Sequence, residues 1–141
     1  MALEMDAVAL NAFLERDFAE VAVDFTVQRA DETELDLRLR VASRHLRPGG
    51  TVSGPTIFAL ADVAVYLAIL SQIGPKALTV TTNASIDFLR KPASGTDLIG
   101  TSRILKLGRV LAVGDVLIYS VGLADPVARA TLTYSIPPVR A

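Results

Sequence analysis

The sequence predicts an α+β domain in which a curved antiparallel sheet wraps around one long central helix. Residues 55–72 are apolar on almost every side, which is typical of a helix buried by other elements. The segments before and after this stretch alternate apolar and polar residues, as half-buried strands do, and short turns join them in antiparallel order. A single sheet can bury such a helix only by curving around it.

Length and composition indicate one folded domain, residues 1–141. Hydrophobic residues make up 51% of the chain, which is enough apolar surface to offset the entropy of ordering and excludes a disordered protein. With no cysteine and one histidine, the chain cannot build disulfides, thiol nucleophiles or metal sites of thiolates or clustered histidines. The net charge of -1, without a basic stripe, argues against a nucleic-acid partner.

Residues 1–20 predict an extra N-terminal helix, because apolar residues recur there at helical steps: Leu3, Ala7, Leu10, Phe13, Leu14 and Phe18. The segment is acidic, whereas an export signal needs a basic start and an apolar run. The most apolar stretch, residues 57–73, is short for a bilayer span and contains a carboxylate. We expect a cytoplasmic protein with no membrane partner. The apolar excess favours an oligomer.

Two strands are expected before the central helix. Residues 21–27 alternate and are rich in β-branched side chains, and Asp31-Glu32 is typical of a turn. In residues 33–41, apolar and charged side chains alternate cleanly, so the two segments are expected to form a hairpin.

The central helix, residues 55–72, follows a loop at 45–54 and ends before Gly74-Pro75. Residues 78–88 then alternate again, with Thr81 and Asn83 on the polar face. Three further strands are expected at residues 97–107, 109–121 and 128–136.

Asp62 is the only charged residue between Arg47 and Lys76, and it lies two turns inside the apolar helix. It is either a structural carboxylate bonded to backbone or to a neighbouring subunit, or a general base or nucleophile. Because an uncompensated buried charge is costly, the functional interpretation is favoured. Tyr66 follows one turn later on the same face, where a core role is favoured over a catalytic one.

The start of the central helix is a candidate electrophilic site. Gly54 allows a ligand close to the backbone, and the N–H groups of Gly54 and Thr56 are candidates to polarise a carbonyl oxygen. The alternative is an ordinary turn capped by Ser53. A triad of Ser53, His45 and Asp62 is disfavoured because no nucleophile-elbow motif surrounds the serine, and His45 is expected to be a solvated loop residue.

These motifs resemble the hotdog-fold acyl-CoA thioesterases, in particular the PaaI-like branch of the 4-hydroxybenzoyl-CoA thioesterase superfamily. That family's pattern is Asn, a short loop, His-Gly-Gly, four residues and Leu-x-Asp. Here it stands as Arg47, Ser53-Gly54-Pro55 and Leu60-Ala61-Asp62. A second match comprises Ile86-Asp87-Phe88-Leu89-Arg90-Lys91-Pro92, Gly95-Thr96-Asp97-Leu98 and Lys106-Leu107-Gly108-Arg109. The resemblance covers residues 33–136.

The resemblance implies a hotdog fold and an active site between the subunits of a homodimer or homotetramer. It implies that Gly54 N–H polarises a thioester carbonyl, that Asp62 activates water or attacks directly, and that a partner-strand hydroxyl, Thr81, orients the water. Asn83 is expected to line the pocket. The basic residues Arg90, Lys91 and Arg109 are expected to contact coenzyme A phosphates; the alternative is that they are solvated loop charges.

Three positions depart from the family's pattern. Arg47 stands where the family has Asn, and it either replaces that donor or points away. Ser53 stands in place of the His. Pro55 replaces the second Gly, which narrows the helix start and removes one N–H group.

The function expected from these residues is hydrolysis of an acyl-CoA thioester, with no metal and no cofactor besides the coenzyme A of the substrate. The alternative is a non-catalytic protein of the same fold that binds acyl-CoA or an acyl carrier, because a fold does not fix a function. Thiol release from a panel of acyl-CoAs distinguishes the two.

Overall fold

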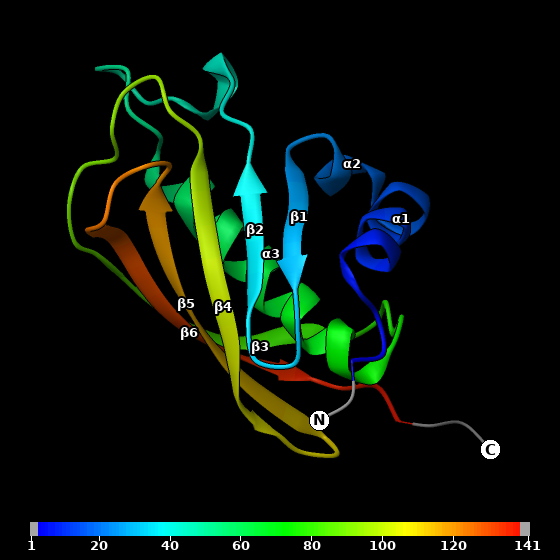
Figure 1. The fold of residues 1–141 in the computed structure, drawn as a ribbon. Coiled ribbons are helices and arrows are strands. Elements are labelled where there is room, and N and C mark those ends of the chain that lie inside the picture. Colours follow the sequence, from blue (N-terminus) through cyan, green and yellow to red (C-terminus); the bar gives the residue numbers. More distant parts are fainter. Residues whose placement is uncertain (1–2, 139–141) are drawn as a thin grey trace.

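The computed structural model describes residues 3–138 and confirms the predicted architecture, an antiparallel sheet curved around one long helix (Figure 1). Six strands form one sheet in the order β1-β2-β4-β5-β6-β3, and every neighbouring pair is antiparallel. This is the hotdog arrangement that the resemblance implied. The elements are α1 (Ala7–Asp17), α2 (Ala19–Ala22), β1 (Phe25–Ala30), β2 (Leu35–Leu39), a 3-10 turn (Ser43–His45), α3 (Gly54–Ile73), β3 (Val80–Phe88), β4 (Leu98–Leu107), β5 (Leu111–Ser120) and β6 (Pro126–Ser135).

Helix α3 lies on the concave face of the sheet, which explains why its sequence is apolar all round. Its length and hydropathy would also suit a membrane span, but most of the helix is buried inside this domain. Two glycines let the helix approach the strands closely. A Cβ at Gly100 would lie 3.3 Å from a methyl of Val116, and a Cβ at Gly114 would lie 2.9 Å from a methyl of Val65 on α3.

The N-terminal segment differs from the single helix expected over residues 1–20. Helix α1 begins after Asp6, whose side chain caps it by accepting a hydrogen bond from Ala9 N–H (2.9 Å). Phe18, in a non-helical conformation, separates α1 from α2. Residues 1–2 and 139–141 of the expected domain lie outside the described residues.

The first strand also begins later than the expected 21–27, because α2 occupies part of that segment. Helix α1 covers the outer edge of β1. The Asn11 side chain accepts from Val27 N–H (2.8 Å) and donates to Val27 C=O (2.9 Å). These two bonds satisfy the backbone N–H and C=O of Val27, which would otherwise be unpaired at an open sheet edge.

Strand β3 is the opposite edge of the sheet, and most of its residues are exposed. A bulge interrupts its register with β6, because Thr81 pairs with Tyr134 whereas Asn83 pairs with Thr133. Directly paired residues share a face, and neighbours on β6 alternate. The bulge therefore turns Thr81 toward α3 and Asn83 to the outer face, so the expectation that both share one face is wrong.

We expect Gly114→Ala to lower the free energy of unfolding by about 1–3 kcal/mol, the usual cost of overpacking a core. The new methyl would press on Val65 and on the Arg103 carbonyl oxygen, 3.2 Å away. Gly100→Ala should cost less because its nearest contact is longer. Urea unfolding of both variants measures the difference; equal stability of Gly114→Ala and the parent protein would contradict this account of the packing.

Candidate functional site

Two hydroxyl groups hold the carboxylate of Asp62. Thr81 Oγ1 on β3 donates to Asp62 Oδ1 (2.7 Å), and the Tyr134 hydroxyl on β6 lies 2.5 Å from the same oxygen and 2.7 Å from the Asp62 carbonyl oxygen. Asp62 Oδ2 has no hydrogen-bond partner among the described residues. One carboxylate oxygen is thus fixed and the other is free to act on a ligand.

The expectation that a second subunit supplies Thr81 to Asp62 is wrong. The hydroxyl in contact with Asp62 belongs to the same chain, because the β3 bulge turns Thr81 toward α3.

A cavity of about 460 Å³ opens beside Asp62. Its walls are largely apolar and aromatic: Phe18, Val63, Tyr66, Ala77, Leu78, Val80 and Tyr134. Tyr66 has the core role favoured by the sequence and also lines this cavity, donating from its hydroxyl to Ala77 C=O (3.0 Å). No Lys, Arg or His is among the described residues that line it. The Asp62 carboxylate therefore depends on hydroxyl donors rather than on a cation.

Burial raises the pKa of both tyrosines in this cavity. For Tyr134 the main cause is desolvation, followed by the negative charge of Asp62 and the hydrogen bond to it. Desolvation and the charge of Asp17 likewise raise the pKa of Tyr66. Both phenols therefore stay protonated at neutral pH, and Tyr134 remains a hydrogen-bond donor to Asp62.

The start of α3 presents one free backbone N–H, that of Gly54. Pro55 has none, Ile57 N–H donates to Ser53 C=O (3.0 Å), and Thr56 N–H is directed at Ser53 Oγ (3.4 Å). The expectation that Thr56 also offers a free N–H is therefore wrong. Ser53 is the helix cap, as the simpler interpretation of the sequence held.

A second cavity, of about 330 Å³, lies beside Gly54 and gathers Arg47, Phe88, Arg90 and Lys91. The guanidinium of Arg90 donates to the Pro126 carbonyl (2.5 Å), which holds this loop near the strand end. Arg47, Arg90 and Lys91 are exposed, so three cations surround the mouth of this cavity. The arrangement suits a polyanionic group next to a backbone donor.

The Asp62 cavity and the Gly54 cavity, here called the two half-sites, are separate within one chain. Asp62 comes eight positions after Gly54 on α3, which at 1.5 Å rise per residue is about 12 Å. Their two cavities share no lining residue. A single thioester group cannot contact both Gly54 N–H and the Asp62 carboxylate of the same chain.

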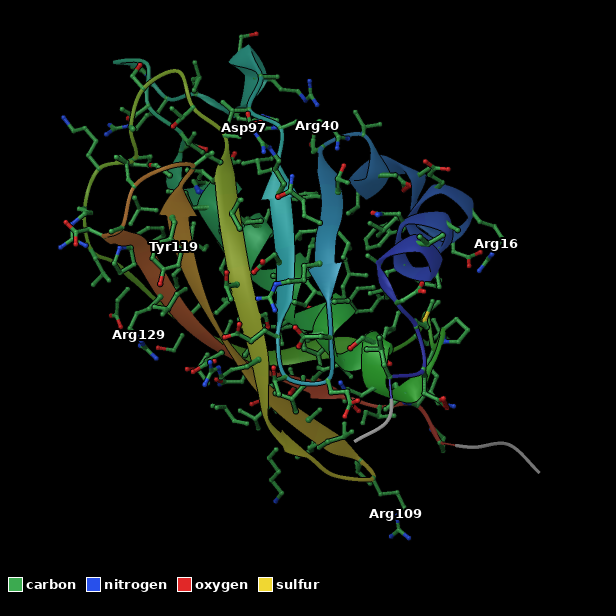
Figure 2. All side chains as sticks on the ribbon, viewed as in Figure 1. Arg16, Arg40, Asp97, Arg109, Tyr119 and Arg129 are labelled. Carbon is green, nitrogen blue, oxygen red and sulfur yellow. The ribbon has the colours of Figure 1, made fainter. Side chains whose placement is uncertain are left out.

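Several residues named from the sequence do not line either cavity. Ser53 and Pro55 flank Gly54 in the chain but are not lining residues, and neither is Asn83. Arg109 lies at the turn between β4 and β5, at the far end of that hairpin from Asp97 (Figure 2). Arg109 is therefore at the end of the sheet where Val80 and Leu111 both pair with Ser135, not beside Arg90.

His45 is buried, not solvated as expected. Its Nδ1 accepts from Ala42 N–H (2.8 Å), and its Nε2 lies 3.2 Å from a carboxylate oxygen of Asp24. The side chain thus ties the loop before α3 to the start of β1, and it lies outside both half-sites.

Tyr134 is the site residue that the sequence did not reveal. It belongs to an alternating run with Ala130 and Leu132, which predicts an inward position but no function. A buried tyrosine hydroxyl needs a hydrogen-bond partner, and that requirement was the one signal in the sequence that could have pointed to a polar contact at Tyr134.

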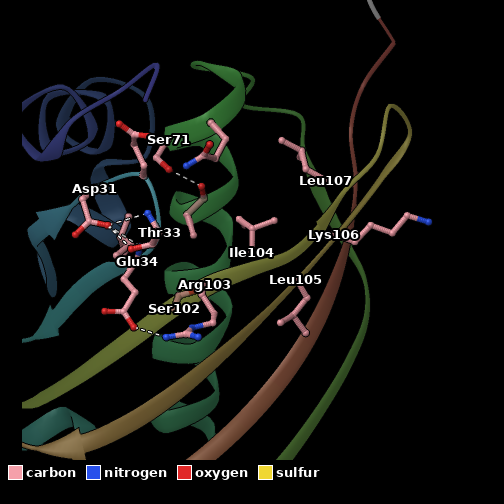
Figure 3. Close-up of a pocket in the computed structure, with 14 residues that line it drawn as sticks. Asp31, Thr33, Glu34, Ser71, Ser102, Arg103, Ile104, Leu105, Lys106 and Leu107 are labelled. Atoms are coloured by element: carbon pink, nitrogen blue, oxygen red, sulfur yellow. Dashed lines mark hydrogen bonds and ion pairs between the residues drawn. The ribbon is translucent and has the colours of Figure 1, made fainter. Parts of the chain in front are cut away.

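A further cavity, about 560 Å³ in volume, lies elsewhere, between the turn joining β1 to β2, the end of β4 and the last turns of α3 (Figure 3). At 100° per residue, Ala68, Ser71 and Gln72 project from the side of α3 opposite Asp62 and Tyr66. No predicted site residue lines this cavity. Within residues 3–138, no group of three or more acidic or histidine side chains is placed to hold a metal ion.

Comparison with known proteins shows which family this chain resembles in sequence and in structure. The sequence model of the thioesterase superfamily matches residues 49–126. The crystal structure of a proposed thioesterase from Silicibacter sp. TM1040 is 55% identical, with a TM-score of 0.91 over 98% of this chain and 96% of that one. No curated protein matches the chain.

Two further solved structures share the architecture. The PaaI protein of the Escherichia coli phenylacetic acid degradation operon is 25% identical, with a TM-score of 0.76 over 89% of this chain and 88% of that one. A hypothetical thioesterase from Streptococcus pneumoniae, solved with coenzyme A, is 22% identical, with a TM-score of 0.71 over 84% and 92% of the two chains.

Proposed function

The chain belongs to the thioesterase superfamily, and we propose that it hydrolyses an acyl-CoA thioester to the free acid and coenzyme A. The observation that carries this proposal is the half-held carboxylate of Asp62, which faces an apolar cavity with one oxygen free. An acyl group fits such a cavity, and a general base must lie within reach of the water it activates.

Asp62 Oδ2 takes a proton from water, and the oxygen of that water forms a bond to the thioester carbon. The carbonyl oxygen becomes an oxyanion, which accepts a hydrogen bond from Gly54 N–H. The tetrahedral intermediate then collapses, the C–S bond breaks, and the thiolate of coenzyme A takes the proton from Asp62. Coenzyme A takes part only as a portion of the substrate.

Because Gly54 and Asp62 of one chain are about 12 Å apart, the proposal requires two copies. The open edge of β3 connects the half-sites: Thr81 near one end contacts Asp62, while Phe88 at the other end lies 3.6 Å from where a Cβ of Gly54 would be. Antiparallel pairing of two β3 edges about a twofold axis through Ser85 would set Ala84 of one copy opposite Ile86 of the other, so that inward residues pair with inward residues. The bulge after Thr81 would then bring Thr81 of one copy to the level of Phe88 of the other.

The exposed apolar residues near this edge favour a second copy as its partner. Leu78, two residues before β3, is 75% exposed, and Phe88, the last residue of β3, is 55% exposed. The outer edge of this strand has no strand partner among residues 3–138. In the paired arrangement, Arg109 falls at the same end as Asp62 and can approach Arg90 and Lys91 of the other copy. Those cations are the proposed contacts of the coenzyme A phosphates.

We expect Asp62→Asn to lower kcat by roughly 10²–10⁴-fold, the range for loss of a general base. Thiol release from aromatic, short and long acyl-CoAs, followed with a thiol reagent, measures it. Asp115→Asn, the same change on the outer face of β5, is the matched control and should leave kcat unchanged. Binding of acyl-CoA without release by the parent protein would instead support the non-catalytic alternative.

We expect mixed oligomers to recover activity that neither parent has. Chains with Asp62→Asn and chains with Gly54→Pro, which removes the free N–H, should each be inactive alone. In a mixed pair, one site combines the intact Asp62 of one chain with the intact Gly54 of the other. Tandem-affinity-purified hetero-oligomers are assayed for thiol release, with thermal unfolding as a check on folding. No recovery of activity in folded mixed pairs would refute the shared site, and so would a mass of 15.0 kDa, that of one chain, for the parent protein by light scattering.

Charge reversal at Arg90 or Lys91 should raise KM for acyl-CoA more than it lowers kcat. Contacts to phosphates far from the reacting carbon stabilise ground and transition states alike. The effect should be larger at low ionic strength, because salt screens exposed charges. Arg16→Glu on α1, outside both cavities, is the matched control; an unchanged KM in the Arg90 and Lys91 variants would place the nucleotide elsewhere.

A further inference from the structure

Among residues 3–138, the Tyr134 hydroxyl is the one deeply buried donor that contacts Asp62. Tyr134 is 3% exposed, and its hydroxyl oxygen lies 2.5 Å from Asp62 Oδ1 and 2.7 Å from the Asp62 carbonyl oxygen. A phenol has one proton, and an ionised carboxylate is the stronger acceptor. The bond to Oδ1 is therefore the principal one.

The position of Tyr134 is itself fixed by packing. Its ring lies 5.9 Å from the ring of Tyr66, which in turn packs against Phe13 and Phe18 at 6.3 and 6.2 Å. On the sheet, Tyr134 pairs directly with Thr81, the second donor to Asp62. The two donors thus come from adjacent strands and converge on one oxygen.

We propose that Tyr134 is a positioning residue for the reaction: it fixes Asp62 Oδ1 together with Thr81, so that Oδ2 alone is presented to water. This inference rests on the proposed function, because it assumes that Asp62 is the base. It assigns proton transfer to Asp62 Oδ2. It also gives strand β6, which lies outside the motifs of the family's pattern, a part in positioning the catalytic base.

The surroundings of Asp62 offer no substitute for the hydrogen bond that the Tyr134 hydroxyl donates to its carboxylate. The other titratable groups lining the cavity are Tyr66 on α3 and Asp17 on α1, and β3 contributes only the Thr81 hydroxyl. None of these is a cation that could replace the lost donor. Hydrogen bonds to charged groups are the stronger class, so their loss has a measurable effect.

Tyr134→Phe keeps the ring and removes the hydroxyl. We expect kcat for an acyl-CoA to fall roughly 10- to 100-fold, the equivalent of one hydrogen bond to a charged group, with KM changed little. The acid limb of the pH profile of kcat, where kcat falls as the pH is lowered, should move to higher pH, because a donor that favours the ionised carboxylate is gone. Tyr119→Phe, the same change on the outer face of the sheet, should behave as the parent protein.

A merely structural role predicts a different result: lower thermal stability of Tyr134→Phe with an unmoved acid limb, which would overturn the inference. Carbon-13 NMR of labelled aspartate carboxyls follows the Asp62 titration without turnover, with Asp62→Asn identifying its signal. Thr81→Val, which removes the other donor to the same oxygen, provides a second test of the acid limb if Tyr134→Phe folds poorly. If the acid limb of the Thr81→Val variant stayed at the pH of the parent protein, that result would also overturn the inference.

The two proposals fail separately. If Asp62→Asn retains turnover, Asp62 is not the base and the proposed function fails whatever Tyr134 does. If Asp62→Asn is inactive while Tyr134→Phe matches the parent protein in kcat and acid limb, only the positioning role fails.

Discussion

Helix α3 carries one charge in twenty residues, and a helix that is apolar on every side has to be covered on every side. The curvature of the sheet, the glycines at positions 100 and 114, and the docking of α1 all serve that burial. Six strands do not complete it at the β3 edge, where apolar side chains remain exposed. The same constraint thus produces the fold and leaves the surface on which a second copy can pair.

The single charge on α3 is stabilised by the same packing. Asp62 faces a cavity lined by aromatic and aliphatic groups, with hydroxyls from β3 and β6 as its hydrogen-bond partners. Hydroxyl donors satisfy a carboxylate without neutralising it, so the free oxygen keeps its ability to accept a proton. A cation in that position would hold the charge more firmly and make it a weaker base.

The sequence predicted the architecture because burial follows periodicity, and the long helix and the alternating strands carry that signal. Asp62 was recognisable as the one charge in an apolar helix, and Gly54 as a glycine at the start of that helix. The sequence did not predict the features that depend on single backbone irregularities. The bulge between Thr81 and Asn83 reverses which residue faces the helix, and Phe18 breaks a pattern that is otherwise helical. Tyr134 was hidden for a different reason, since a tyrosine at an inward strand position has the same pattern as any core residue.

The two hydrogen bonds between Asn11 and Val27 limit how far copies of this sheet can join. A sheet with two open edges can add strands at either end without limit and grow into a fibre. Here the Val27 backbone on the β1 edge already bonds a side chain of the same molecule, whereas the outer edge of β3 has no such partner among residues 3–138. When two β3 strands pair about a twofold axis, both free edges are consumed and growth stops at two. Asn11 therefore obstructs strand addition at Val27 on β1, the strand at the opposite end of the sheet order from β3.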